Sequence, residues 1–330
     1  MIEIRGLKKD FASRRGTVHA VNGVDLSIPT GKIVGLVGES GSGKTTVGRM
    51  LLRLVEPTAG AIEVDGTNIV GLPAKAMVLY RKRLQMIFQD PYSSLNPRMR
   101  ISESISEGLA LYARAEGRVS EDTCEALLEQ VGLSAEHAGR YPHEFSGGQR
   151  QRVGIARALA SSPDLVVADE PVSALDVSVQ AQILELLIGL KKRRSLTMLF
   201  ISHDLEVVEY ISDEVVIMYL GKVMECGPTK DVYARPLHPY TRALLSSTPI
   251  PIPGQAKRRP SLVGEIPSPL ALPSGCVFRT RCRYADDACA RAVPDFRDFG
   301  SERKIACIRA EEIENDTAHE TPVAGALAWQ

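Results

Sequence analysis

One glycine-rich turn carries the residues best suited to hold a phosphate chain. It runs from Gly38 to Thr45, after an apolar run at 33–37 that predicts a buried strand and before a pattern at 46–54 that predicts a helix. Its glycines let backbone N–H groups face an anion, and the helix start adds a positive dipole end. Lys44 can reach the β- and γ-phosphates, and the Thr45 hydroxyl can bind Mg²⁺. The turn therefore predicts a nucleoside triphosphate site formed by Gly38, Glu39, Ser40, Gly41, Ser42, Gly43, Lys44, Thr45 and Thr46.

A second glycine-rich loop consists of Ser146, Gly147, Gly148 and Gln149. Apolar residues between 153 and 159 recur with helical spacing, so this loop lies at a predicted helix N-terminus and is a second candidate anion site. Alone it is weak evidence, but two such loops in one chain require an explanation.

Three more predicted strands each finish in side chains able to do chemistry. Gln89 ends the strand at 84–88, Asp169 and Glu170 follow the apolar run at 165–168, and His203 follows the run at 196–201. In open α/β sheets, ligands bind beyond the carboxyl ends of the strands. Adjacent carboxylates on a strand point in opposite directions, so one can hold the water shell of a metal while the other orients and deprotonates an attacking water. A solvated turn and a structural histidine are the alternatives, and the P-loop favours the catalytic interpretation.

The first 35 residues are expected to form short strands and turns. Phe11 lies among them in a polar, basic setting. It could stack on a nucleotide base or be an edge-strand aromatic packed locally, and the spacing favours neither interpretation.

The composition is that of a globular protein and excludes several classes of function. The chain has 330 residues, of which 44% are hydrophobic and 24% charged, enough for one large domain with an appendage or for two modest domains. Lys and Arg number 40, as do Asp and Glu, so the basic footprint of a nucleic-acid-binding domain is absent and no nucleic acid partner is expected. No apolar run is long enough to span a membrane, and the N-terminus lacks the apolar stretch of a signal peptide. A cytoplasmic protein is the expectation.

The composition changes near residue 230, where prolines become frequent and indicate loops, as at 249–253 and 267–273. We therefore predict a domain at 1–230 and a C-terminal extension at 231–330. Four cysteines of the extension, Cys276, Cys282, Cys289 and Cys307, are separated by five, six and 17 residues. In a reducing compartment cysteines favour metal binding or free thiols over disulfides, and this spacing is not the paired pattern of common zinc sites. An iron–sulfur cluster, zinc and free thiols all stay open, whereas Cys124 and Cys226 are predicted to be packed thiols.

Taken in order, these motifs resemble those of ATP-binding subunits of ABC transporters. Six motifs within residues 1–230 carry the resemblance: Gly38–Thr45, Gln89, Ser146–Gln149, Asp169 with Glu170, Ser173–Asp176, and His203. It implies an α/β fold, with a P-loop NTPase (RecA-like) core around a mixed sheet, an ABC helical subdomain at about 90–160, and a loop-rich C-terminal extension. Phe145 stands where leucine is usual and Thr45 where serine is frequent, and neither change removes a needed atom.

The resemblance also implies a head-to-tail dimer with ATP held between two chains. It assigns catalysis to Lys44, Gln89, Glu170 and His203, and Mg²⁺ binding to Thr45, Gln89 and Asp169. The loop at 146–149 would reach the γ-phosphate held by the partner chain, which explains the two phosphate-seeking loops. Phe11 falls where the family places its base-stacking aromatic, Gln89 would couple nucleotide to the membrane subunits, and Asp176 joins the nucleotide site.

Three stretches, at 88–99, 140–144 and 238–244, are similar to the dipeptide/oligopeptide importer branch. On that resemblance the chain hydrolyses ATP to energise import of di- or oligopeptides, or of another solute such as nickel or glutathione. We expect it at the cytoplasmic face of the cell (inner) membrane, with two permease subunits, a second ATPase subunit that is a copy or a paralogue, and indirectly a solute-binding protein. A soluble ABC ATPase outside transport is the alternative.

Some members of this branch have a similar cysteine pattern and carry a [4Fe–4S] cluster. The resemblance therefore implies Cys276, Cys282, Cys289 and Cys307 as cluster ligands, beside ATP and Mg²⁺.

Overall fold

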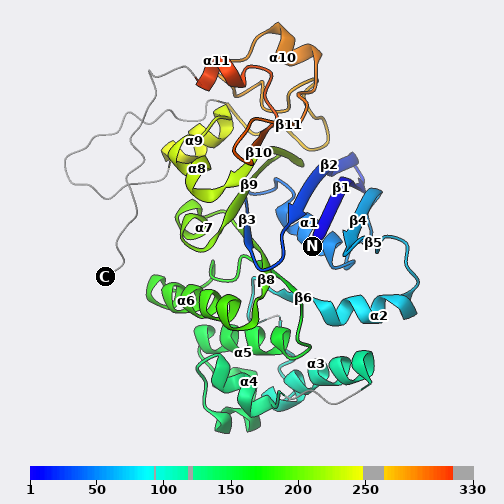
Figure 1. Ribbon diagram of the computed structural model, residues 1–330, viewed down its shortest axis with the longest axis vertical. Coiled ribbons are helices and arrows are strands. Elements are labelled where there is room, and N and C mark those ends of the chain that lie inside the picture. The colour runs from blue at the N-terminus through cyan, green and yellow to red at the C-terminus, as the bar shows by residue number, and fades with distance from the viewer. Residues whose placement is uncertain (93, 118–121, 248–263, 315–330) are drawn as a thin grey trace, which may run out of the picture.

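A mixed sheet of eight strands forms the centre of the molecule in the computed structural model, which describes residues 1–92, 94–117, 122–247 and 264–314 (Figure 1). The order across the sheet is β11 (Arg297–Asp298), β12 (Lys304–Ile305), β10 (Lys222–Pro228), β9 (Glu214–Tyr219), β3 (Ile33–Val37), β8 (Thr197–Ser202), β7 (Leu165–Asp169) and β6 (Leu84–Ile87). The strands from β9 to β6 are parallel, and those from β9 to β11 pair antiparallel. The predicted α/β class with a mixed sheet is confirmed.

Four neighbouring parallel strands determine where the predicted nucleotide-site residues lie. Every residue of β3, β7 and β8 is buried, as expected for apolar runs covered on both faces. The register pairs Val37 with Ser202 and Asp169 with Ile201, and β6 is in step with β7. The carboxyl ends of β3, β8, β7 and β6 therefore lie level along one edge of the sheet.

Each face of this sheet packs on its own hydrophobic core. Ile33 and Val37 of β3 belong to the core shared with α5 (Gly147–Leu159), α6 (Val177–Arg194) and α7 (Leu205–Ile211). The alternate residues Val34 and Leu36 belong to the core shared with α1 (Lys44–Leu51) and the N-terminal strands. The strand alternation thus divides β3 between two layers.

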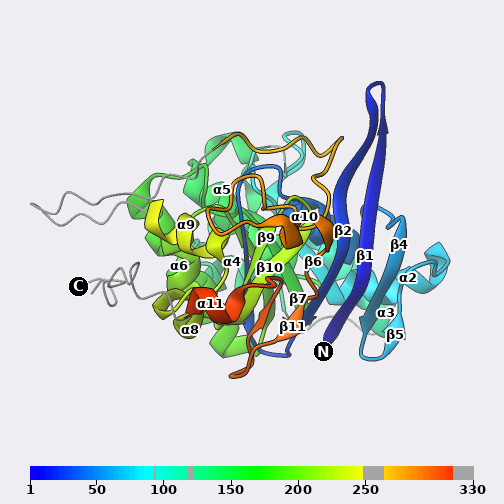
Figure 2. The same ribbon diagram turned by 90° about the horizontal axis from the view of Figure 1, so that it is seen from above.

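A second, antiparallel sheet has the order β2 (Gly16–Ile28), β1 (Ile2–Ser13), β4 (Ala59–Val64) and β5 (Thr67–Asn68). The expectation of short strands in the first 35 residues is wrong, because β1 and β2 are 12 and 13 residues long. β1 pairs with β4 only as far as Lys8, so the rest of β1 and β2 projects as a hairpin (Figure 2). Register shifts interrupt the pairing, and the tip has no core to cover, so its sequence lacks the alternation that marks a long strand.

Helices between β4 and β7 gather at the end of the molecule opposite the C-terminal strands (Figure 1). They are α2 (Ala74–Arg83), α3 (Ile101–Glu116), α4 (Cys124–Gln130), the 3₁₀ turns η1 (Ala135–Gly139) and η2 (Pro142–Glu144), and α5. α5 contacts α3, α4 and α6, and also β6, so it connects this group to the sheet. The predicted extent of the helical subdomain, about 90–160, stays a prediction.

The C-terminal extension contains α8 (Thr229–Ala234, which begins just before it), α9 (Pro239–Ser247), α10 (Asp287–Arg291) and α11 (Ala310–Glu314). Its strand β12 pairs with β10, and Tyr240 and Phe278 are buried in the same core as β3 and β9. Long stretches at 264–286 are turns without helix or strand, as the prolines indicate. The proline-rich stretch at 249–253 and the end of the chain from 315 lie outside the described residues. The predicted domain boundary near 230 stays a prediction.

A buried ion pair joins the extension to the central sheet. Glu225 of β10 is fully buried, and its carboxylate pairs with the guanidinium of Arg303, whose side chain is 8% exposed. The same carboxylate accepts backbone N–H bonds from Leu237 and His238, at 3.1 and 3.0 Å. Arg303 also donates to the Arg235 carbonyl at 2.8 Å. Each charge is therefore compensated by hydrogen bonds as well as by its partner.

Among the described residues, no helix is both long and apolar enough to cross a membrane.

Replacing Glu225 with Gln removes the charge that Arg303 faces while nearly keeping the side-chain shape. Because a lone buried guanidinium is costly, we expect the free energy of unfolding to fall by about 3–5 kcal/mol. Urea denaturation followed by circular dichroism measures this change. The control is Arg5→Gln, which breaks an exposed ion pair with Glu63 and should cost about 1 kcal/mol or less. Equal effects of the two substitutions would contradict this account.

Candidate nucleotide site

The P-loop (residues 38–45) connects β3 to α1 and passes so close to neighbouring backbone that glycine is required at two positions. Gly38 has φ +154°, and a Cβ there would lie 2.1 Å from the Met218 carbonyl oxygen. Gly43 has φ +100°, and a Cβ there would lie 2.3 Å from the Ala20 carbonyl oxygen. The loop is thus held between β9 and β2, with α1 beginning at Lys44. A helix N-terminus after a glycine-rich turn suits a phosphate group.

Lys44 places its charge at the centre of this loop. Its side-chain nitrogen donates to the carbonyl oxygens of Gly38 at 2.7 Å and Glu39 at 3.0 Å. Burial lowers the pKa of Lys44, and the nearby carboxylates of Glu170, Asp169 and Glu39 act in the opposite direction. A poorly solvated cation surrounded by acceptors is suited to bind phosphate oxygens.

Thr45 and Asp169 meet across the gap between α1 and β7. The threonine hydroxyl donates to the Asp169 carboxylate at 2.8 Å, and Asp169 is 2% exposed. Burial raises the pKa of Asp169, while the hydrogen bond from Thr45 and the charges of Arg49 and Lys44 lower it. A hydroxyl and a carboxylate at this position form the oxygen pair that holds Mg²⁺ in P-loop NTPases.

Glu170 is the point where three strand ends converge. Gln89, after β6, donates its side-chain amide to one carboxylate oxygen at 2.9 Å, and the His203 Nδ1, after β8, lies 3.0 Å from the other. The Glu170 side chain is 17% exposed, so water reaches it. Glu170 has φ +46°, a left-handed conformation that is unfavourable for a residue with a side chain and is characteristic of functional positions. The predicted residues Gln89, Glu170 and His203 are therefore brought together.

The second glycine-rich loop lies against the start of α6. Ser146 is the exposed N-cap of α5, and its hydroxyl and backbone N–H exchange hydrogen bonds with Gln149 at 3.3 and 3.0 Å. Gly147 lies against Leu175, and a Cβ on Gly148 would lie 2.5 Å from the Val179 side chain. The loop therefore has an exposed N-cap residue and lies next to the start of α6.

Two other predicted nucleotide-site residues are exposed. Asp176 is the N-cap residue of α6. Phe11 is 40% exposed on the projecting hairpin, where it pairs with Val18 and lies 5.0 Å from the ammonium of Lys9. Neither contacts the P-loop in the described part of the chain, so their roles toward nucleotide stay predictions.

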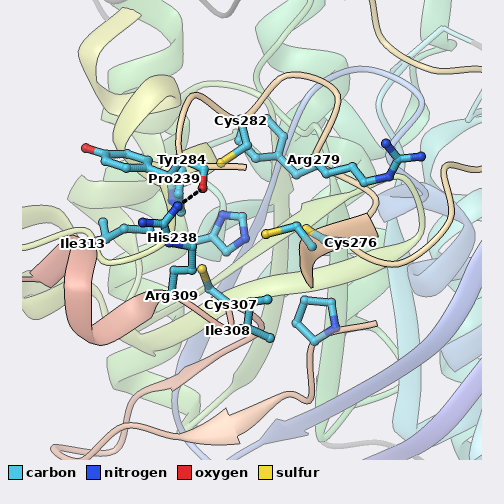
Figure 3. Close-up of a pocket in the computed structure, with 13 residues that line it drawn as sticks. His238, Pro239, Cys276, Arg279, Cys282, Tyr284, Cys307, Ile308, Arg309 and Ile313 are labelled. Carbon is cyan, nitrogen blue, oxygen red and sulfur yellow. Dashed lines mark hydrogen bonds between the residues drawn. The ribbon is translucent and has the colours of Figure 1, made fainter. Parts of the chain in front are cut away.

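The four cysteines of the extension line one cavity, with a volume of about 20 Å³ (Figure 3). Cys276 donates its backbone N–H to the Cys289 carbonyl at 2.8 Å, which connects two of them. Burial raises the pKa of Cys282 to about 11 and that of Cys307 to about 12. Within the described ranges, no group of three or more His, Cys, Asp or Glu side chains is arranged to hold a metal ion. The metal-site prediction is therefore not supported by this arrangement of the thiols. Cys124 is buried and Cys226 is half-buried, at other places in the fold.

Two residues of the extension contact the P-loop without any signal in the sequence. The Tyr240 hydroxyl accepts the backbone N–H of Glu39 at 2.9 Å, and Arg281 pairs with the Glu39 carboxylate at 2.6 Å. Tyr240 lies in one of the stretches that resemble peptide importers, but nothing in its type or spacing indicates contact with a phosphate-binding loop. Arg281 lies 242 positions from Glu39, and only the fold brings them together.

Comparisons with known proteins agree with this geometry. Residues 21–173 match the family described as ABC transporter, and residues 224–289 match the oligopeptide/dipeptide transporter C-terminal region. A putative peptide import ATP-binding protein of Brucella ovis is 54% identical over 309 residues, covering 94% of this chain and 98% of that protein. A putative oligopeptide transport ATP-binding protein of Bacillus subtilis is 50% identical over 313 residues, covering 93% and 94%.

Solved structures with a fold similar to that of this chain include ATP-binding cassettes. A dimeric ATP-binding cassette in a post-hydrolysis state, bound to ADP and Pi, matches with a TM-score of 0.62 at 28% identity, covering 69% of this chain and 99% of that chain. A component of an ABC transporter complex of Clostridium perfringens matches with a TM-score of 0.61 at 26% identity, covering 71% and 90%. The chain belongs to the ATP-binding proteins of the ABC transporter family, in the branch of the peptide importers. It is an ATP-hydrolysing enzyme that uses Mg²⁺, and the predicted family is confirmed.

Replacing Glu170 with Gln tests the convergence of the strand ends. The amide keeps the shape of the carboxylate but cannot accept a proton from water, so we expect ATP turnover to fall by about 10²–10⁴-fold while ATP binding persists. Phosphate release and binding of a fluorescent ATP analogue measure the two properties. Glu129→Gln, on the exposed side of α4, is the matched control and should leave both unchanged. Normal turnover in the Glu170 variant would exclude it as the catalytic base.

Proposed function

We propose that this chain energises the import of di- or oligopeptides by hydrolysing ATP at a site shared with a second ATPase subunit. The observation that carries the proposal is the convergence of Gln89, Glu170 and His203 beside the Thr45–Asp169 pair, along one edge of the sheet. These are the parts that hydrolysis of a nucleoside triphosphate requires: a phosphate cradle, a metal-binding oxygen pair and an oriented base.

Each residue has a defined task in this mechanism. Lys44 binds the β- and γ-phosphates, and its charge offsets the charge that develops during transfer. Glu170 orients the attacking water for in-line displacement and accepts its proton. His203 keeps the Glu170 carboxylate in place and contacts the γ-phosphate. Thr45, Asp169 and Gln89 would hold Mg²⁺, which would neutralise phosphate charge.

The second glycine-rich loop completes the nucleotide site of the partner chain. Ser146 and its glycines lie at an exposed helix start, which supports a contact with phosphate held by another subunit rather than by this one. Asp176 is the N-cap of α6, and its sequence neighbour Leu175 lies against Gly147 of that loop. The partner is a copy of this chain or a paralogue, and Phe11 stacks on the adenine from the projecting hairpin.

The names of the relatives support peptides as the transported solute. The Brucella ovis and Bacillus subtilis proteins are named for import of peptides and transport of oligopeptides. By this proposal the chain binds two permease subunits at the cytoplasmic face of the membrane and receives solute from a binding protein through them. Import of nickel or glutathione, and an ATPase outside transport, are the competing functions.

Purification of the tagged chain from membranes tests this proposal. We expect two permeases, a second ATPase and a solute-binding protein among its partners by mass spectrometry. The reconstituted complex should take up a labelled tripeptide and lose uptake with Glu170→Gln. Uptake of Ni²⁺ or glutathione in place of the peptide would correct the solute, and recovery of a partner-free ATPase would refute transport.

A second proposal concerns the cofactor: the four cysteines of the extension ligate an iron–sulfur cluster. The donor set supports it, because four thiols line one cavity together with the guanidinium-bearing residues Arg279 and Arg309, whose charge can offset thiolates. The size of the cavity does not support a cluster, because a volume of about 20 Å³ admits about one water molecule. A cluster would need more room than this cavity has, and no catalytic step depends on it.

Iron analysis of anaerobically purified protein, with its visible absorption spectrum, tests this second proposal. We expect about four irons per chain, lost with Cys282→Ser or Cys307→Ser and kept with the control Cys124→Ser. Iron-free, colourless protein would refute the proposal.

A further inference from the structure

The C-terminal extension contacts the P-loop at Glu39, a position that phosphate binding itself leaves open to any residue type. The Arg281 guanidinium makes two parallel bonds to the Glu39 carboxylate, 2.6 Å from Nη1 to Oε2 and 3.0 Å from Nη2 to Oε1. The side chains of Arg281 and Glu39 are 5% and 21% exposed, so solvent screens the pair only partly. A two-pronged pair of this kind fixes direction as well as distance.

Aromatic residues hold Arg281 in place. The Tyr219 hydroxyl lies 3.3 Å from Nη1, and the guanidinium lies 5.7 Å from the centre of the same ring. Tyr219 packs in turn against Tyr240 and Phe278, with ring centres 4.7 and 5.3 Å away. These rings are among the most deeply buried side chains of the molecule, so Arg281 packs against a rigid part of the core.

Glu39 is thereby held at three points. Its carboxylate binds Arg281, its backbone N–H donates to the Tyr240 hydroxyl at 2.9 Å, and its carbonyl accepts from Lys44 at 3.0 Å. The first two contacts come from the extension and the third from the phosphate-binding lysine. The extension therefore fixes the position of the backbone at Glu39, whose carbonyl accepts the hydrogen bond from the Lys44 ammonium.

A second contact joins the extension to the N-terminal hairpin. His19 of β2 donates its backbone N–H to the Pro269 carbonyl at 3.0 Å. His19 lies opposite Asp10 on the hairpin that carries Phe11. The extension thus touches both the P-loop and the hairpin.

Charge gives Arg281 a further role. The Lys44 ammonium donates to the Glu39 carbonyl at 3.0 Å, so Glu39 also lies close to where a polyphosphate binds. An unpaired carboxylate there would repel ATP, and Arg281 neutralises it.

We propose that Arg281 is a positioning residue for ATP binding, through which the C-terminal extension orders the P-loop and cancels the charge of Glu39. This inference rests on ATP binding at the P-loop, as the proposed function does, but not on the transported solute. Its consequence is a change in affinity for ATP rather than in the chemical step, because neither Arg281 nor Glu39 contacts the strand-end residues Gln89, Glu170 and His203.

The test compares ATPase kinetics of the purified complex carrying Arg281→Ala, Arg281→Lys, or Arg281→Ala combined with Glu39→Gln. For Arg281→Ala we expect the KM for ATP to rise about tenfold while kcat changes by less than about twofold. Arg281→Lys should recover part of the loss, because it keeps the charge but not the two-pronged geometry. The double variant should recover most of it, since it no longer has an unpaired carboxylate.

Arg283→Ala is the matched control, because this exposed arginine of the same segment stacks on Tyr284 and does not contact the P-loop. A purely structural role would lower thermal stability and kcat together, and Glu39→Gln would not restore KM. An unchanged KM in Arg281→Ala, or no recovery in the double variant, would overturn the proposal. An inactive wild-type complex would instead refute the proposed function, so the two failures are distinguishable.

Discussion

The register of four neighbouring parallel strands is the constraint on which the site depends. β3, β8, β7 and β6 end level with one another, so the residues that follow them meet at one edge of the sheet. A slip of one residue in any of these pairings would turn a polar side chain into the apolar core. The burial of both faces of β7 and β8 prevents such a slip, because every side chain of these strands already has a packed environment.

The site concentrates features that a stable fold otherwise avoids. Lys44 and Asp169 are buried ionisable groups whose pKa values are shifted by burial toward the neutral forms, and Glu170 has a left-handed backbone conformation. Such features persist only where the surroundings hold them, and here the surroundings are the sheet edge and the tightly wrapped P-loop. In the proposed mechanism these unfavourable groups are the ones that bind phosphate, metal and water, which is where such strain serves a function.

The C-terminal extension is part of the same hydrophobic core rather than an appendage on a linker. Tyr240 and Phe278 pack with β3 and β9, and the buried Glu225–Arg303 pair connects β10 to the last strands. The extension therefore contacts both the P-loop and the N-terminal hairpin. Tyr240 and Arg281 of the extension contact the P-loop directly, at Glu39.

The sequence alone determined the fold class and predicted the residues of the candidate site, because the P-loop, the strand-end residues and the buried strands are local patterns of residue type and spacing. It could not show that β1 and β2 are long, since their tip has no core to impose alternation. The grouping of Gln89, Glu170 and His203 was expected from strand ends, but the bonds between them depend on strand order, which local patterns do not encode. Arg281 and Glu39 are 242 positions apart, and only the packing of the extension on β9 and β10 brings them together. Contacts of this kind were decided by the tertiary structure, because no short-range pattern specifies which distant segment will cover a given surface.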